Sequence, residues 1–292
     1  MFWANVQNQR SSSATRLSSW HPNPVWRRAS TTLVQLLGNA LKLIFFIDFK
    51  LRPGKRYRIP AASPVKRPLR AIKKIPRIFW QTNHSAEVTL SVYVNYLFNR
   101  FLTPTFEYRF FDDDDCEKYV REKCSGEIYE CYSRLQIGAA RADLWRVLVL
   151  LHEGGIYLDI DAAFSWCPES FLLPDQTELL LREGDGRLTN YFLAASPGNK
   201  IFADIRDRIV SNIHSNSLKS VFDMTGPTVV DIVAGCAAVE VERTKLVCRQ
   251  GQFTKKVFQY PDNLRGYWAR EEEKKPIVKE REPTPKSQAS PR

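Results

Sequence analysis

The chain has 292 residues, 43% of them hydrophobic, which is enough for one large globular domain or two small ones. Its formal net charge of +11 is unevenly placed: up to Lys74 there are 15 Lys and Arg against a single acidic residue, Asp48, and the remainder carries −3. This asymmetry argues for an anionic surface as partner of the N-terminal quarter, and against one for the rest of the chain.

The six cysteines form no CxxC pair and have no histidine partner at zinc-binding spacing. Neither a metal cluster nor a disulfide framework is therefore indicated. Reduced thiols, as in a cytosolic-facing enzyme, are the default expectation, although a luminal protein could still pair some of them.

Residues 1–74 are expected to form a basic, partly disordered N-terminal segment. Residues 1–30 show no sustained periodicity. The most apolar run, Leu33 to Phe49, is shorter than the ~20 residues of a bilayer span and contains Lys42. A basic stretch interrupted by prolines follows it to Lys74. An apolar helix followed by basic residues is typical of an interfacial membrane anchor; a solvated linker, or a helix packed on the domain, is the alternative.

The next elements are predicted from short apolar patterns. Lys74 to Gln81, KIPRIFWQ, predicts a β-strand, in which Trp80 is either a platform for a nucleobase or a core side chain. Near-helical spacing predicts a helix over Val88 to Phe101, and a second strand is expected over Phe106 to Phe111. Asp112 to Asp115 are interpreted as caps of the following helix and not as metal ligands.

The stretch Leu135 to Phe164, LQIGAARADLWRVLVLLHEGGIYLDIDAAF, is expected to organise the fold. Its apolar residues predict a buried helix over Gln136 to His152. Gly154 and Gly155 lack the Cβ that would disfavour a left-handed C-cap, and a β-branched and aromatic strand follows over Ile156 to Ile160.

Four charged residues of this stretch are candidate site residues. Asp159 and Asp161 point to the same side of the strand end, because side chains alternate along a strand. Two carboxylates so close repel each other unless a cation lies between them or one is protonated, and we expect a hard divalent ion. Asp143 and Arg146, three apart on one helix face, are either a structural ion pair or part of a shared site with the aspartates.

The run ARADLWRVLVLLHEGGIYLDIDA resembles the signature of the DXD sugar-transferases of glycosyltransferase family 32, a group with fungal mannosyltransferases, α-1,4-galactosyltransferases and many bacterial polysaccharide enzymes. The resemblance extends more loosely from Ile75 to about Val230. It implies a GT-A type α/β fold, in which a Rossmann-like nucleotide-sugar-binding half has a mostly parallel central sheet and is joined to an acceptor-binding half.

The resemblance implies roles for the candidate residues. Trp80 would stack on the base of the nucleotide, and Asp161 would hold Mn²⁺ or Mg²⁺ directly. Asp159 would hold the metal, the ribose hydroxyls or both. Asp143 and Arg146 would hydrogen-bond the hydroxyls of the donor sugar.

Two later segments match the family pattern and one departs from it. Asn190, in TNYFLAA, would help to orient the donor sugar, and Thr225-Gly226-Pro227 matches a turn near the active-site cleft. The His-containing, Trp-rich lid of many relatives has no counterpart here except Tyr267-Trp268, which could replace part of it.

The expected protein is a metal-dependent, retaining hexosyltransferase that moves a sugar from a nucleoside-diphosphate sugar to a glycan, glycolipid or polysaccharide acceptor in polysaccharide biosynthesis. Residues 75–269 would form the catalytic domain, and 270–292 a disordered charged tail. Residues 33–74 would bind an anionic membrane, at the cytoplasmic face in a bacterium or, alternatively, as the anchor of a Golgi-type luminal enzyme.

Two other classes remain as alternatives. A haloacid-type metal-dependent phosphatase also carries Asp-x-Asp after an apolar strand, but it normally has a Thr where this chain has Ala163. A non-catalytic membrane- or nucleic-acid-binding protein would account for the basic N-terminus. No motif of interleaved aromatic and basic residues supports a nucleic-acid partner.

Overall fold

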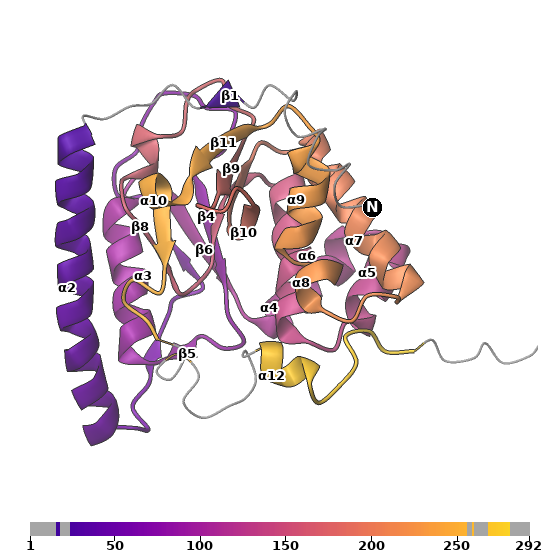
Figure 1. Ribbon diagram of the computed structural model, residues 1–292, viewed down its shortest axis with the longest axis horizontal. Helices are drawn as coiled ribbons and strands as arrows, with labels where there is room; N and C mark the ends of the chain where they lie inside the picture. Colours follow the sequence, from indigo (N-terminus) through magenta and orange to yellow (C-terminus); the bar gives the residue numbers. More distant parts are fainter. Residues whose placement is uncertain (1–15, 18–23, 256–258, 260–267, 281–292) are drawn as a thin grey trace, which may run out of the picture.

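The computed structural model describes residues 16–17, 24–255, 259 and 268–280, and an eight-stranded sheet forms its centre (Figure 1). The strands lie in the spatial order β1 (Arg16–Leu17), β11 (Glu240–Arg243), β9 (Glu178–Arg182), β10 (Leu188–Ala195), β7 (Gly155–Leu158), β4 (Ile78–Thr82), β6 (Glu107–Phe111) and β3 (Ala62–Ser63). β10 is antiparallel to both neighbours and β3 is antiparallel to β6, while the other four pairs are parallel. The expected α/β class with a mostly parallel central sheet is confirmed.

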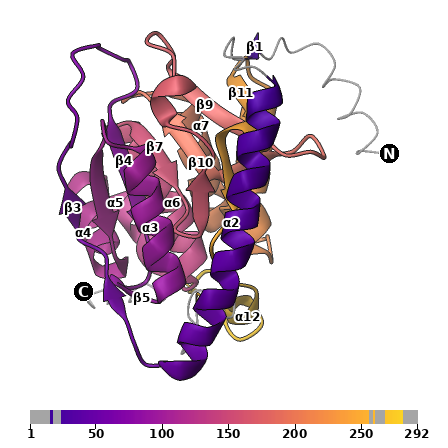
Figure 2. The same ribbon diagram turned by 90° about the vertical axis from the view of Figure 1, so that its left-hand side faces the viewer.

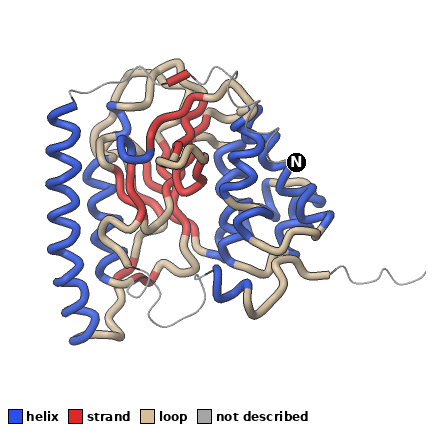
Figure 3. Tube along the Cα trace, viewed as in Figure 1, coloured by secondary structure: helices blue, strands red, loops and turns tan. Residues whose placement is uncertain are grey.

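Helices cover both faces of this sheet (Figure 3). One face carries α4 (Asp113–Lys123), α5 (Gly126–Arg134), α6 (Gly138–His152), α7 (Lys200–Ser215), α8 (Val221–Met224) and α9 (Pro227–Gly235). The other face carries α2 (Pro24–Leu51), α3 (Leu90–Leu102) and α10 (Thr244–Val247), together with the small sheet of β8 (Ala162–Phe164) and β12 (Cys248–Gln250). The remaining elements are β2 (Tyr57–Arg58), paired with β5 (Glu87–Val88), the 3₁₀ turn η1 (Pro168–Ser170) and α12 (Trp268–Glu272).

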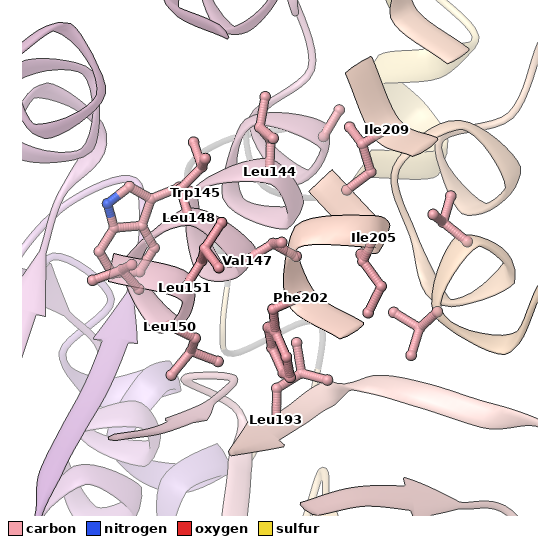
Figure 4. Close-up of a cluster of buried hydrophobic side chains, with 14 of the residues drawn as sticks. Leu144, Trp145, Val147, Leu148, Leu150, Leu151, Leu193, Phe202, Ile205 and Ile209 are labelled. Carbon is pink, nitrogen blue, oxygen red and sulfur yellow. The ribbon is translucent and has the colours of Figure 1, made fainter. Parts of the chain in front are cut away.

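The predicted central helix is confirmed as α6, which is buried on nearly every side from Asp143 to Leu151. Figure 4 shows Leu144, Val147 and Leu148 of this helix among side chains of α7 such as Ile205. Because the whole helix is covered, the charged residues in it must find partners inside the protein.

The two glycines after α6 allow the chain to turn directly into β7. Gly154 and Gly155 have φ of 68° and 108°, in the left-handed region, as the prediction required. A Cβ on Gly155 would lie 2.6 Å from the carbonyl oxygen of Ile78, so this position also permits the close approach of β7 to β4. The turn returns the chain along α6 and places the end of β7 near the N-terminal half of the helix.

The interpretation of Asp112 to Asp115 as caps is confirmed. Asp112 accepts a hydrogen bond from the backbone N–H of Asp115, and the carboxylate of Asp115 accepts one from the N–H of Asp112, which is a capping box at the start of α4. All six cysteines are free thiols.

Helix α2 is longer than the apolar run that predicted it, and it lies beside α3 (Figure 2). Its portion Thr32–Leu51 is long and apolar enough to cross a membrane, and only 11% of an 18-residue window within it is buried in the protein. The helix rests on the domain through Phe45, which packs with Phe253, and through Gly38, where a Cβ would lie 2.5 Å from Nε2 of Gln252. The rest of its apolar surface points outward.

The folded unit extends beyond the expected catalytic domain, residues 75–269, at both ends. Residues before Ile75 contribute to the sheet, since β3 pairs with β6, and Ile59 is buried. The expected disordered tail from residue 270 does not begin there: Val278 bridges to Leu135 and is 1% exposed. Residues 268–280 therefore belong to the folded unit, because they bury apolar side chains and pair with the entry to α6; residues 281–292 lie outside the described residues.

Candidate active site

A large cavity, about 1780 Å³ in volume, opens where the parallel strands β4, β6 and β7 end. Ligands of open α/β sheets bind at such carboxyl ends of strands. Segments distant in sequence line it: Thr82 to His84 after β4, Asp159 to Asp161 after β7, and the turn before α9. The cavity also reaches Trp268, at the start of α12.

Arg146 joins the predicted charged residues into one cluster. Its guanidinium lies 3.1 Å from Oδ1 of Asp143 and 3.2 Å from Oδ1 of Asp159, and it sits 4.5 Å over the centroid of the Tyr157 ring. The side chains of Asp143 and Arg146 are each only 7% exposed. The helix pair is thus part of a site shared with the strand aspartate, as the glycine turn indicated.

Asn190 and Thr225 complete the surroundings of Asp143. The amide of Asn190 donates to Oδ1 of Asp143 at 2.9 Å, and the hydroxyl of Thr225 donates to Oδ2 at 2.9 Å. Arg146 in turn donates to the carbonyl of Asn190 at 2.8 Å. Oδ1 is engaged by both Asn190 and Arg146, whereas Oδ2 has Thr225 as donor and retains a second lone pair. Asp143 is therefore held on both sides and can still accept from a ligand in the cavity through Oδ2.

Asp161 has a different environment, without a cationic partner at ion-pair distance among the described residues. Its carboxylate accepts from the amide of Gln250 at 3.2 Å and 3.3 Å, and its backbone carbonyl accepts from the N–H of Gly251 at 2.9 Å. β12 pairs with β8, which follows directly after Asp161, and this pairing brings Gln250 to the site.

The electrostatics of the cluster favour a bound cation. Burial raises the pKa of Asp143 to about 6, and burial together with repulsion from Asp159 raises that of Asp161 to about 7. Burial alone would lower the pKa of Arg146, but Asp159, Tyr157 and Asp143 outweigh it and the pKa is raised. Three carboxylates against one guanidinium leave two negative charges when all are ionised, which a divalent cation would neutralise.

The donor set fits Mg²⁺ or Mn²⁺ held in part by a substrate. Within the described residues no three His, Cys, Asp or Glu side chains are grouped to hold a metal, so a cage made entirely of protein ligands is not present there. Mg²⁺ is usually held by one or two carboxylates together with water and substrate phosphates. Asp161 would be the direct ligand, while Asp159 is already engaged by Arg146 and by the hydroxyl of Tyr157 at 2.7 Å.

The prediction that Trp80 forms a base-stacking platform is not supported by its position. Trp80 is 4% exposed, packs edge-on against Phe111 and Trp145, and donates from Nε1 to the carbonyl of Gly154 at 2.8 Å. It does not line the cavity, whereas Thr82, two residues later, does. Both side chains face the same side of β4, but Trp80 packs against Trp145 of α6, whereas Thr82 contacts Cys116 of α4 and borders the cavity. The alternative, a core tryptophan, is the one observed.

Trp80→Ala is therefore expected to lower the free energy of unfolding by ~3–5 kcal/mol, the usual cost of removing a buried aromatic side chain. Nucleotide affinity of the remaining folded protein should stay within about twofold, because the side chain touches no part of the cavity. Thermal unfolding and titration with UDP and GDP would measure the two effects. A selective loss of nucleotide affinity with unchanged stability would indicate that Trp80 contacts the nucleotide after all.

Two site residues were missed in the sequence. Tyr157 supports Arg146 with its ring and Asp159 with its hydroxyl. Its signal was present, since it lies two residues before Asp159 and faces the same side of the strand. Gln250 carried no local signal, because it reaches Asp161 only through the pairing of β12 with β8.

Comparison with known proteins shows what the region around the site resembles. Residues 87–178, which include α6 and both strand aspartates, match the family model described as "Glycosyltransferase sugar-binding region containing DXD motif". The initiation-specific alpha-1,6-mannosyltransferase of Schizosaccharomyces pombe is 26% identical over 186 residues, covering 52% of this chain and 46% of the relative. The chain therefore spans about half the length of this curated relative.

Residues 87–178 thus resemble the sugar-binding region of the DXD glycosyltransferases. Both matches support the resemblance to glycosyltransferase family 32, and the strand order agrees with the α/β class and mostly parallel central sheet expected from the sequence. Two solved structures are also similar. The "PaToxG Glycosyltransferase" has a TM-score of 0.47 and 16% identity, covering 72% of this chain and 79% of that one. The UDP-bound glycosyltransferase domain from the YGT toxin has a TM-score of 0.35 and 15% identity, covering 48% and 53%.

The raised pKa of Asp161, about 7, predicts how cation binding depends on pH. A proton on this carboxylate competes with the cation, so Mn²⁺ affinity should fall roughly tenfold per pH unit below that pKa. Asp159, Arg146 and Gln250 face the group, and of these only Gln250 and Arg146 favour its charged form.

The stability of the metal-free protein should show the opposite trend. Because the folded pKa lies above that of an unfolded Asp, the folded state binds more protons between about pH 4 and 7, and its stability falls as the pH rises through this window. Melting temperatures with and without MnCl₂ between about pH 5.5 and 8 would test both trends. A Mn²⁺ shift that is independent of pH would contradict the role of Asp161.

Proposed function

We propose that the protein transfers a hexose from a nucleoside-diphosphate sugar to a glycan, glycolipid or polysaccharide acceptor, with Mn²⁺ or Mg²⁺ bound at Asp161 and Asp159. One observation carries the proposal: Asp143, Arg146 and Asn190 converge with these aspartates at one cavity, although they come from separate elements. The region that matches the DXD family model holds four of the five.

Different residues of the chain would bind the diphosphate and the sugar of the donor. Asp161, whose carboxylate faces the cavity, would hold the cation, and that ion supplies charge neutralisation for the diphosphate leaving group when it is bound. Asp143 and the planar guanidinium of Arg146 would hydrogen-bond the sugar hydroxyls. Asn190 fixes Asp143 from one side and Thr225 from the other, so little reorganisation is needed when the sugar binds.

The haloacid-type phosphatase is the less suitable alternative. Such an enzyme needs a free carboxylate on the first aspartate as nucleophile, whereas Asp159 is engaged by Arg146 and Tyr157. The threonine that such phosphatases carry would lie at the position of Ala163, which has no hydroxyl and is 1% exposed.

A panel of UDP- and GDP-sugars incubated with Mn²⁺ would test the proposed activity. A transferase releases the nucleoside diphosphate and, without acceptor, hydrolyses the donor slowly; a phosphatase releases inorganic phosphate instead. Release of phosphate alone, or no turnover of any donor with and without added glycan acceptors, would contradict the proposal.

We also propose that residues 33–74 hold the protein at an anionic membrane surface. The outward face of α2 exposes an apolar row that includes Leu33, Leu36, Leu43, Ile44, Ile47 and Leu51, each between 49% and 76% exposed. On the adjacent α3, Phe101 is 77% exposed, and Ile72 in the following basic stretch is 89% exposed. Exposed apolar surface on this scale marks an interaction site, and the neighbouring basic residues favour anionic headgroups.

Vesicle binding is expected to depend on both parts of this segment. High salt should weaken binding of the full chain to anionic vesicles, since it screens the basic residues. Ile44→Glu together with Ile47→Glu should abolish binding, because two charges would enter the apolar face. Cosedimentation with anionic and neutral vesicles measures both effects. Lys200→Glu is the matched control, because its exposed side chain lies at the start of α7, on the opposite face of the sheet from α2. Resistance of the full chain to salt and alkaline extraction would indicate a true span; absence of vesicle binding would refute the proposal.

A further inference from the structure

Three buried side-chain amides hold the backbone that carries the two aspartates. Gln81 lies in β4, and Asn95 and Asn99 lie one turn apart in α3; all three are 0% exposed. The amide of Gln81 donates to the carbonyls of Leu158 and Asp159 at 3.2 Å and 3.3 Å.

The two asparagines bind the carbonyls that follow. Asn95 donates to the carbonyls of Ile160 and Ala162, both at 2.8 Å, and Asn99 donates to that of Ala162 at 2.9 Å. The carbonyl of Asp161, between them, accepts from the N–H of Gly251. Five consecutive carbonyls, 158 to 162, are thus held by groups outside their own strand.

The fold explains why this backbone needs such partners. β7 ends at Leu158, and β8 begins at Ala162 in a different sheet. The N–H of Asp159 still donates to the carbonyl of Tyr191, but the chain then leaves the ladder of hydrogen bonds, with Ile160 buried and both aspartates half-buried. A buried carbonyl without a partner is costly. Both aspartates and Ile160 border the cavity, and Ile160 also belongs to the buried hydrophobic cluster that contains Phe79 and Phe164.

At Asn95 the NH₂ group of the side-chain amide makes the hydrogen bonds, so its role is to donate to backbone carbonyls. Within the described residues its Oδ1 has no hydrogen-bond partner, although the atom is buried. Turning the amide over would place Oδ1 against two carbonyl oxygens, so the orientation is dictated by its partners. An apolar side chain would fill a helix position in this core without an unsatisfied oxygen, and the asparagine is explained by the two carbonyls that it binds.

We propose that Gln81, Asn95 and Asn99 are positioning residues that fix the directions of Asp159 and Asp161 and thereby set the cation affinity of the site. The inference rests on the proposed function of these aspartates. It assigns a role to α3, a helix that contributes no side chain to the cavity lining. Residues that orient metal ligands from behind typically change metal affinity by 10–100-fold when they are replaced.

The test uses the full chain with Asn95→Asp, which keeps the shape and replaces the donating group by an oxygen. Asn95→Leu, similar in volume and uncharged, is the second variant in case the charge prevents folding. The matched control is Asn199→Ala. The amide of Asn199 donates to the carboxylate of Glu178 and to the carbonyl of Thr177. Asn199 lies shortly after Ala195, which pairs with Gly155 at the start of β7, whereas the aspartates follow the other end of that strand.

Two measurements separate positioning from plain stability. Hydrogen exchange of the peptide spanning 158–165 should be faster in both Asn95 variants and unchanged in the control. The dissociation constant for Mn²⁺ alone, measured by electron paramagnetic resonance, should rise at least about tenfold in the Asn95 variants and stay near the wild-type value in the control.

The outcomes distinguish this inference from the proposed function. Asn95 variants that lose stability as the control does, yet keep wild-type exchange and Mn²⁺ affinity, would overturn the positioning role. A wild-type chain that binds Mn²⁺ neither alone nor in the presence of UDP would contradict the proposed metal dependence; the exchange measurement then decides whether the amides hold this backbone.

Discussion

Asp161→Asn is expected to lower metal-dependent sugar transfer by roughly 10²–10³-fold, a loss of about 3–4 kcal/mol of transition-state stabilisation. The substitution keeps the shape and the hydrogen bond to Gln250 while removing the charge that a divalent cation requires. Melting of the metal-free protein should be unchanged or raised, since the repulsion between Asp161 and Asp159 disappears. The stabilisation by MnCl₂ should be lost.

Steady-state transfer and melting curves with and without MnCl₂ measure these effects. Asp207→Asn provides a matched control, because its side chain is 64% exposed on α7 and lies away from the cavity lining. Activity of Asp161→Asn above about a tenth of wild type would contradict its role as metal ligand.

Arg146→Met is expected to reduce the free energy of unfolding by ~3–5 kcal/mol and to abolish transfer. Methionine replaces the length of the side chain, but it leaves the buried carboxylates of Asp143 and Asp159 without their shared cation. The carbonyl of Asn190 also loses its donor. The loss should be larger at pH 8 than near about pH 5.5, because both aspartates can take up protons at the lower pH.

A triple variant distinguishes the structural effect from the catalytic one. Adding Asp143→Asn and Asp159→Asn to Arg146→Met removes the unpaired charges, so most of the stability should return while transfer stays absent. Arg146→Lys is the charge-conserving control; it should be less destabilised than Arg146→Met, yet still impaired because an ammonium group cannot span both carboxylates as a planar guanidinium does. Recovery of transfer in the triple variant would contradict the proposed contact with the donor sugar.

The central unit from α6 to β7 could be predicted from the sequence because its determinants are local. Helical spacing, two glycines and a β-branched run specify helix, turn and strand within a few residues of one another. The same unit carries Asp143, Arg146, Asp159 and Asp161, so the glycine turn alone was sufficient to indicate that they meet. The capping box at Asp112 was predictable for the same reason.

The position of Trp80 was decided by packing over the strand. Strand alternation specifies which side the indole faces but not what covers that side, and α6 covers it with Trp145. The expected disordered tail was wrong for residues 270–280 for a similar reason. Their composition is charged, yet Val278 pairs with Leu135, which is distant in sequence. The composition of a segment indicates how much apolar surface it has, but not which other segment it packs against in the folded protein.

The sequence by itself determined the α/β class, the central helix-turn-strand and the charged residues of the site, since each of these depends on neighbours along the chain. Only the tertiary structure decided that Gln250 would reach Asp161 and that Asn95 and Asn99 would bind the backbone of the aspartates from behind. The physical reason is that a buried carbonyl or carboxylate must find a partner in space. Which residue provides that partner depends on how strands and helices distant in sequence are brought together.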